Sequence, residues 1–81
     1  MPMTVRLFAT LKDRAGSGQV TVAVEPPLRV GDLLAALTEA YPALTPALPM
    51  TLVAVNLAYA DQDTLLQPGD EVALFPPVSG G

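Results

Sequence analysis

The chain contains no cysteine, no histidine and no tryptophan. Without cysteine no disulfide can form, and without cysteine and histidine an ordinary zinc site has no ligands. The same absences remove thiol nucleophiles and the commonest general acid–base side chain. We therefore expect no metal site and a chain of 81 residues held together by the packing of its core, and most sequence signatures of enzymes are absent.

Basic residues are also scarce, because four Lys and Arg stand against eight Asp and Glu, for a formal net charge of −4. A nucleic-acid-binding protein needs a basic surface that displaces counterions from phosphates, so nucleic acid is not an expected partner. An acidic surface favours a basic partner protein instead.

Long apolar runs are missing as well. The first ten residues lack the basic and apolar regions of a signal peptide, and no run approaches the roughly 18 apolar residues of a membrane span. We expect no membrane partner and a cytoplasmic location, which the absence of cysteine fits.

The first half of the chain predicts two strands and a helix. Residues 3–9 and 19–24 alternate between apolar and polar side chains, which is typical of paired strands of a hairpin. The residues expected to face the core are Met3, Val5, Leu7, Ala9, Val20, Val22 and Val24. Charges and glycines in residues 11–18 predict a loop between the strands. Helical spacing then predicts the main helix, with inward positions at Val30, Leu33, Leu34, Leu37, Ala40 and Tyr41. Pro42 ends this helix, and Arg29 at its start is a weaker cap than Ser or Thr.

The second half predicts three further strands. Residues 51–56 indicate a strand buried on both faces, and residues 58–60 a short edge strand. Residues 71–75 indicate the last strand, with Val72 and Leu74 inward and Glu71, Ala73 and Phe75 outward. This order predicts an α+β fold in which a mixed sheet of four to five strands carries one main helix on one face.

Two sets of residues have competing interpretations. Residues 15–18, Ala-Gly-Ser-Gly, superficially suggest a phosphate loop, but they lack the spacing and the lysine of that motif, so a hairpin turn is favoured. Asp61, Asp63, Asp70 and Glu71 do not match a calcium-binding loop, and solvated acidic loops are favoured. A docking patch for a basic partner, or an acid–base pair, remains an alternative for these carboxylates.

Phe8 and Phe75 are both expected on outward-facing positions of strands. Single exposed apolar residues are common on protein surfaces. If the two strands are neighbours, however, the two rings form an apolar patch that continues over Pro76, Pro77 and Val78, and such patches mark interfaces with a partner.

The chain closes on Phe-Pro-Pro-Val-Ser-Gly-Gly. Pro76 and Pro77 fix the backbone as it leaves the last strand and favour an extended arm, which Val78 and Ser79 lengthen. We predict a single domain over residues 1–81 with a flexible tail at residues 76–81.

The last two residues are glycines. Gly80 and Gly81 have no side chains, so they fit a narrow channel and let a nucleotide or another backbone approach closely. The carboxylate of Gly81 is unhindered and suited to activation as an acyl phosphate or an acyl adenylate. The alternative interpretation is that the two glycines are merely a floppy end or a cloning scar.

Residues 53–81, VAVNLAYADQDTLLQPGDEVALFPPVSGG, resemble the C-terminal third of the molybdopterin synthase small-subunit family. The matching segments are Val55-Asn56, residues 69–72 and the closing motif at residues 75–81. Residues 5–18 and 30–42 resemble the first strand and the helix of that family. The resemblance implies a ubiquitin-like β-grasp fold.

The resemblance also implies a function as a sulfur carrier. An activating enzyme is expected to use ATP to adenylate Gly81, and sulfur supplied by a sulfurtransferase then gives a thiocarboxylate. The tail, Pro77 to Gly80, is expected to insert into the large synthase subunit, with Phe8, Phe75 and Pro76 at the interface. There the sulfur passes to a cyclic pyranopterin precursor of the molybdenum cofactor. The resemblance implies a heterotetramer with the active site on the large subunit, and no tightly bound cofactor on this chain.

Three other functions are compatible with the sequence. One is a sulfur carrier for thiamine thiazole synthesis or tRNA thiolation, and another is a ubiquitin-like modifier joined to lysines through Gly81. An inert interaction domain is the remaining alternative. Identification of the protein that copurifies with the chain would distinguish them.

Overall fold

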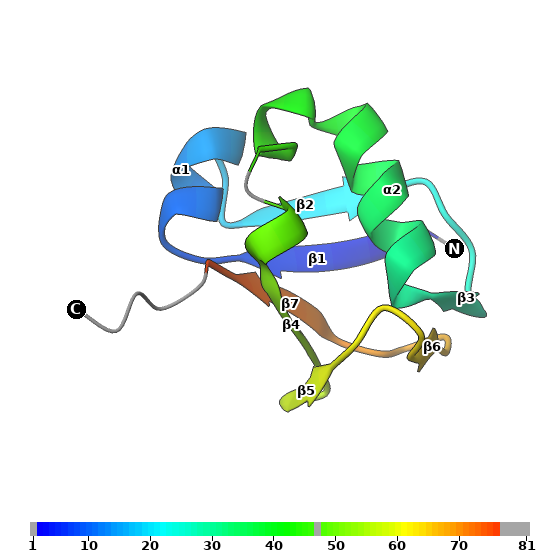
Figure 1. Cartoon of the computed structure of the whole chain (residues 1–81). Coiled ribbons are helices and arrows are strands. Elements are labelled where there is room, and N and C mark those ends of the chain that lie inside the picture. The colour runs from blue at the N-terminus through cyan, green and yellow to red at the C-terminus, as the bar shows by residue number, and fades with distance from the viewer. Residues whose placement is uncertain (1, 47, 77–81) are drawn as a thin grey trace.

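The computed structural model describes residues 2–46 and 48–76. Its centre is a five-stranded mixed sheet (Figure 1). The strands are β1 (Met3–Leu7), β2 (Gln19–Val22), β4 (Leu52–Val55), β5 (Ala58–Ala60) and β7 (Val72–Phe75), in the order β2-β1-β7-β4-β5. β1 and β7 are parallel, and the other neighbours are antiparallel. One main helix, α2 (Val30–Ala40), packs on one side of the sheet, so the predicted α+β architecture is confirmed.

Smaller elements surround this centre. A two-stranded antiparallel ribbon joins β3 (Leu28–Arg29) to β6 (Leu65–Leu66) below the start of α2. Two 3-10 turns, η1 (Pro42–Leu44) and η2 (Leu48–Met50), connect α2 to β4. No helix in residues 2–46 and 48–76 is long and apolar enough to cross a membrane.

The core lies between the sheet and the helices. The inward residues of β1, β2 and β7 are buried as predicted: Met3, Val5, Leu7, Val20, Val22, Val72 and Leu74. Leu33 and Leu37 of α2 close over them and are fully buried, and burial of each such leucine contributes about 1.5–3 kcal/mol. Ala40, also expected inward, is exposed at the end of the helix.

The predicted loop over residues 11–18 is wrong in its first part, because Thr10–Ala15 form helix α1. Leu11 is fully buried and anchors this short helix on the core. Ala9, predicted to face the core, is instead exposed with a φ of 53° where the chain leaves β1. Gly16 ends the helix in the left-handed region, at a φ of 77°, and its N–H donates to the carbonyl of Lys12. The Ala-Gly-Ser-Gly segment is therefore a helix end leading into β2.

The start of α2 obtains its hydrogen-bond partners from elsewhere in the chain. Arg29 stands at the N-cap and makes no capping bond with its side chain, as the sequence suggested. The Val30 and Gly31 N–H groups donate to the carbonyls of Thr64 and Gln62, at 2.9 and 3.0 Å. The Arg29 N–H donates to the Asp32 carboxylate at 3.3 Å. These acceptors satisfy N–H groups that a helix start otherwise leaves without a protein partner.

Candidate functional site: the open face of the sheet

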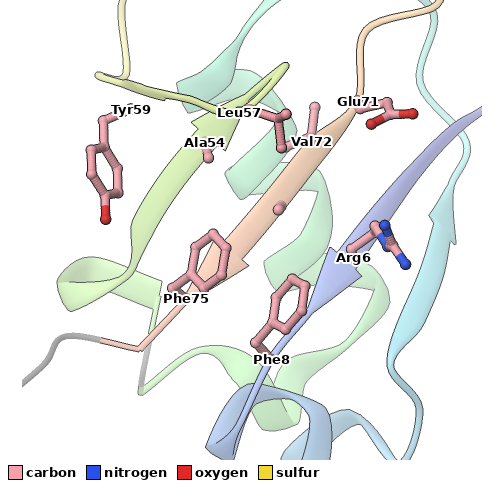
Figure 2. A pocket seen from close by; sticks show the side chains of 9 residues that line it. Arg6, Phe8, Ala54, Leu57, Tyr59, Glu71, Val72 and Phe75 are labelled. Carbon is pink, nitrogen blue, oxygen red and sulfur yellow. The ribbon is translucent and has the colours of Figure 1, made fainter.

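Phe8 and Phe75 stack on each other at one end of the sheet. Their ring centroids lie 4.6 Å apart, with an angle of 10° between the ring planes (Figure 2). The parallel register pairs Leu7 with Leu74, so the residue after each leucine lies beside its counterpart on the next strand. Phe8 follows the last residue of β1, and Phe75 is the last residue of β7. The two strands are therefore neighbours, so the condition on which the predicted apolar patch depended is met.

The stacked pair lies on the face of the sheet opposite α2. Figure 2 looks onto this face, with the side chains in front of the strands and the helices behind. Among residues 2–46 and 48–76, no helix covers it. The face is therefore the surface of the described structure on which a partner can meet the central strands directly.

A hollow of about 270 Å³ lies in this face. The strand register explains it, because Ala73 of β7 pairs with Ala54 of β4, and these two small side chains form the floor. In the same row Ala73 is opposite Arg6, and Ala54 is opposite Tyr59. Small residues in the middle of a row with large residues at its ends produce a depression between the larger side chains.

The rim of the hollow is apolar on the side of β5. Tyr59 is 79% exposed, and Leu57, in the turn between β4 and β5, is 97% exposed. Together with the half-exposed Phe8 and Phe75, they surround the alanine floor. Exposed aromatic and aliphatic side chains around a pocket are typical of a protein–protein contact surface.

The remaining side of the rim is polar. Arg6 of β1 and Glu71, just before β7, lie at the edge of the hollow away from Tyr59. The face thus offers an apolar floor and rim, with one cationic and one anionic side chain along one margin. Such a surface suits a partner that presents apolar side chains with polar groups at their border.

Asn56 joins the turn after β4 to the loop that precedes β7, at the end of this face away from Phe75. Its backbone N–H donates to the Glu71 carbonyl at 2.8 Å, and its side-chain oxygen accepts from the Glu71 N–H at 2.9 Å. Its side-chain amide donates to the Asp70 carboxylate at 2.9 Å. The turn after β4 is therefore joined to the loop that leads into β7.

The Asp70 carboxylate stabilises its own loop. It accepts from the backbone N–H of Gln67 at 2.8 Å, and this bond, followed by the one from Asn56, lowers the pKa of Asp70 below its ordinary value. Asp61 acts similarly in the preceding loop, where it accepts from the Asp63 N–H at 2.9 Å and from the Thr64 hydroxyl at 3.2 Å. Asp61 and Asp70 therefore have structural partners, in agreement with the favoured interpretation of acidic loops.

The structure brings only part of the predicted site together. Pro76 follows Phe75 directly and is half-buried. The predicted tail residues lie outside the described residues: Pro77, Val78, Ser79, Gly80 and Gly81.

The sequence interpretation missed the alanine floor, because residues 51–56 were expected to be buried on both faces. Leu52 is in fact 39% exposed, and Ala54 is buried at the bottom of the hollow. It also missed Leu57 and Tyr59, whose exposure depends on the short edge strand.

Comparison with known proteins identifies the family. Residues 5–81 match the ThiS family. The molybdopterin synthase sulfur carrier subunit of Chlamydomonas reinhardtii is 37% identical over 83 residues, covering 100% of both chains. The crystal structure of SAMP1 from Haloferax volcanii aligns with a TM-score of 0.85 at 40% identity and 100% coverage of both chains. A chain from a Helicobacter pylori complex of subunits 1 and 2 of molybdopterin-converting factor aligns with a TM-score of 0.70 at 28% identity, also with 100% coverage of both chains.

The chain therefore belongs to the ThiS family, of small proteins with the ubiquitin-like β-grasp fold. The match extends over nearly the whole chain, including the tail, and the similar curated proteins include molybdopterin synthase sulfur carrier subunits. The family resemblance inferred from the closing motif is thereby confirmed.

Proposed function

We propose that this chain is the sulfur carrier subunit of molybdopterin synthase. The observation that carries the proposal is the full-length match to a protein of that name, at 37% identity from end to end. The similarity to one subunit of the Helicobacter pylori complex supports a companion subunit for this chain as well. The open face beside Phe75 supplies a surface on which such a companion can dock.

The proposed chemistry takes place at the carboxylate of Gly81. An activating enzyme joins this carboxylate to the AMP part of ATP, releasing pyrophosphate. A thiol reductant releases sulfide from the persulfide of a sulfurtransferase and is itself oxidised to a disulfide. The sulfide then attacks the acyl carbon and displaces AMP, leaving a thiocarboxylate, and this displacement exchanges no electrons. Cysteine is absent from the chain, so the carried sulfur resides at this terminal carbon.

Transfer takes place on the companion, the large synthase subunit, in a heterotetramer of two small and two large subunits. The companion docks on the open face and receives residues 77–81, which bring the thiocarboxylate to a cyclic pyranopterin precursor. Holding the sulfur on a bound polypeptide makes its delivery effectively intramolecular, which accelerates the reaction. We assign the groups that move protons to the companion, since histidine, the commonest general acid–base side chain, is absent from this chain.

The experiment is mass spectrometry of the intact chain after coexpression with its activating enzyme and sulfurtransferase. We expect the mass to rise by the difference between sulfur and oxygen. Because the chain has no cysteine, the thiocarboxylate is the only ionised sulfur available to iodoacetamide, so one carbamidomethyl group should be added at Gly81.

A variant with one alanine added after Gly81 should gain neither the mass of the sulfur-for-oxygen exchange nor the carbamidomethyl group. It should also support no molybdopterin formation. The matched control carries the same alanine between Met1 and Pro2 and should behave like the wild type. If the variant extended after Gly81 remains active, the proposed chemistry is wrong.

A second candidate function is a protein modifier joined to lysines through Gly81. The similarity to SAMP1 favours it, because that structure is 40% identical to this chain, and a curated protein named small archaeal modifier protein 1 is 41% identical to this chain over 87 residues. The two functions share the activation step and differ in the product. Adducts of higher mass that survive thiol reagents in cell extracts indicate isopeptide bonds, whereas sulfur transfer leaves the chain at its original mass.

A further inference from the structure

The turn between β4 and β5 contains an unusual backbone conformation. Asn56 and Leu57 both lie in the positive-φ region, at 52° and 70°. A tight hairpin with two such residues favours Asn at the first and Gly at the second. Asn56 suits its place, since a short polar side chain tolerates this conformation, but leucine is bulky and rarely adopts it.

Within the described structure, the leucine is not buried, so no apolar burial offsets the energetic cost of its backbone conformation. Its side chain is 97% exposed, the highest value among the exposed large apolar residues of the described chain. Glycine at this position would relieve the backbone, and a polar residue would suit the solvent better. A strained residue that is also an exposed apolar one is a mark of function rather than of folding.

Asn56 holds the turn in a fixed place. Its three hydrogen bonds to residues 70 and 71 join the turn to the strand that leads to Phe75. Leu57 is therefore presented from an anchored turn. A side chain held in this way loses less conformational entropy when a partner covers it.

The position of Leu57 relates it to the tail. It lies at one end of the alanine-floored hollow, and Phe75 lies at the other. Glu71 lies four residue steps before Phe75 along the chain, a span of about 13 Å at roughly 3.3 Å per step. A protein that holds the chain beyond Pro76 is placed against Phe75, and the hollow continues from there to Leu57.

We propose that Leu57 is an anchor residue for the companion subunit that receives the tail, presented at a cost to the stability of the free chain. This inference rests on the proposed function, since the occupant of the hollow is the large synthase subunit. The companion would provide an apolar recess for Leu57 and an apolar side chain that fills the hollow above Ala54 and Ala73. Uninterrupted continuity of the hollow with the exit of the tail favours this occupant over a second copy of the chain.

The test measures the stability of the free chain and its affinity for the large subunit in the same variants. Leu57→Gly removes the strain and the side chain together. We expect its Tm to rise by about 5 °C, while its Kd for the large subunit increases by about tenfold or more, which means weaker binding. Opposite changes in stability and affinity are the signature of a residue kept for binding.

Three further variants separate the causes. Leu57→Asn also relieves the backbone but offers a polar side chain, so it should match Leu57→Gly in both measurements. Leu57→Met retains an apolar side chain and the strain, so its Tm and Kd should stay near those of the wild type. Leu65→Asn removes another exposed leucine, 48% exposed on β6 and not part of the hollow, and should leave the Kd unchanged.

The outcomes distinguish the two proposals. If the wild type does not bind the large subunit in calorimetry, both the proposed function and the proposed role of Leu57 are wrong. If the wild type binds and Leu57→Gly binds equally well, the proposed role of Leu57 is wrong while the proposed function stands. A lower Tm for Leu57→Gly would overturn the claim that the leucine costs stability.

Discussion

The two faces of β7 differ although they alternate along the same four residues. Val72 and Leu74 point to the core and are 1% and 0% exposed, whereas Ala73 and Phe75 point to the open face and are half-buried. Large aliphatic side chains on the inner face pack against α2. On the outer face, small and large side chains alternate and leave a hollow. The central strand thus serves the fold with one set of residues and the candidate site with the other.

This difference assigns stability and binding to separate residues. Changes on the inner face should affect folding first, because they leave cavities in a close-packed core. Changes on the outer face should affect binding more than folding, because their neighbours there are solvent or a partner. The predictions below test this separation, from the largest effect to the smallest.

Leu74→Ala should cause the largest loss of stability. The side chain is fully buried, so its truncation removes apolar contacts and leaves a cavity, at a cost of about 2–5 kcal/mol. Thermal unfolding should show a Tm lower by about 10 °C or more. Ala73→Ser, the neighbouring change on the open face, is the matched control and should cost less than about 1 kcal/mol. Equal losses from the two variants would contradict the separation of the faces.

Phe8→Ala should have a smaller effect on stability and a clear effect on binding. The ring is 39% exposed, and loss of its stacking on Phe75 costs about 0.5–1.5 kcal/mol beyond the area it buries. Affinity for the large subunit, measured by calorimetry, should fall by about tenfold or more. Phe8→Leu, which keeps an apolar side chain, should retain more of the affinity. If Phe8→Ala binds the large subunit as tightly as the wild type, the stacked pair is not part of the proposed interface.

The smallest effect concerns Asp70 and acid. Hydrogen bonds from Gln67 and Asn56 lower its pKa in the folded chain, so its contribution to stability is complete above its unfolded pKa near 3.8. That contribution is lost as the pH falls through the lower pKa of the folded state. Unfolding followed between pH about 5 and about 2 should therefore depend less steeply on pH in Asp70→Asn than in the wild type. An unchanged slope would show that these bonds do not favour the charged carboxylate.

Much of the fold was predictable, because long periodic segments determine it. Alternation identified β1, β2 and β7, and helical spacing identified α2 within a residue or two of its ends. Helix α1 was missed because its charges and the following glycines resemble a loop, and a single buried leucine anchors it. The β3–β6 ribbon was missed because each strand has two residues, too few for any period to be visible.

The candidate site was predictable only in part. The outward positions of Phe8 and Phe75 follow from strand alternation, and their contact follows once β1 and β7 are neighbours. The alanine floor depends on the register between β4 and β7, which joins residues far apart in the sequence. The role of Leu57 could not be predicted from the sequence. The second residue of such a hairpin turn is usually glycine, so a leucine there does not indicate the turn. Asn56, a favoured first residue of such a turn, was the one local indication.

The most direct test of the account is a single turnover with the thiocarboxylated chain, the large subunit and the pyranopterin precursor. The mass of the small chain and the formation of molybdopterin are followed in the same samples. We predict that the mass returns from thiocarboxylate to carboxylate in step with product formation, and that the Leu57→Gly chain does so more slowly below saturation. Formation of molybdopterin while the thiocarboxylate remains intact would contradict the account.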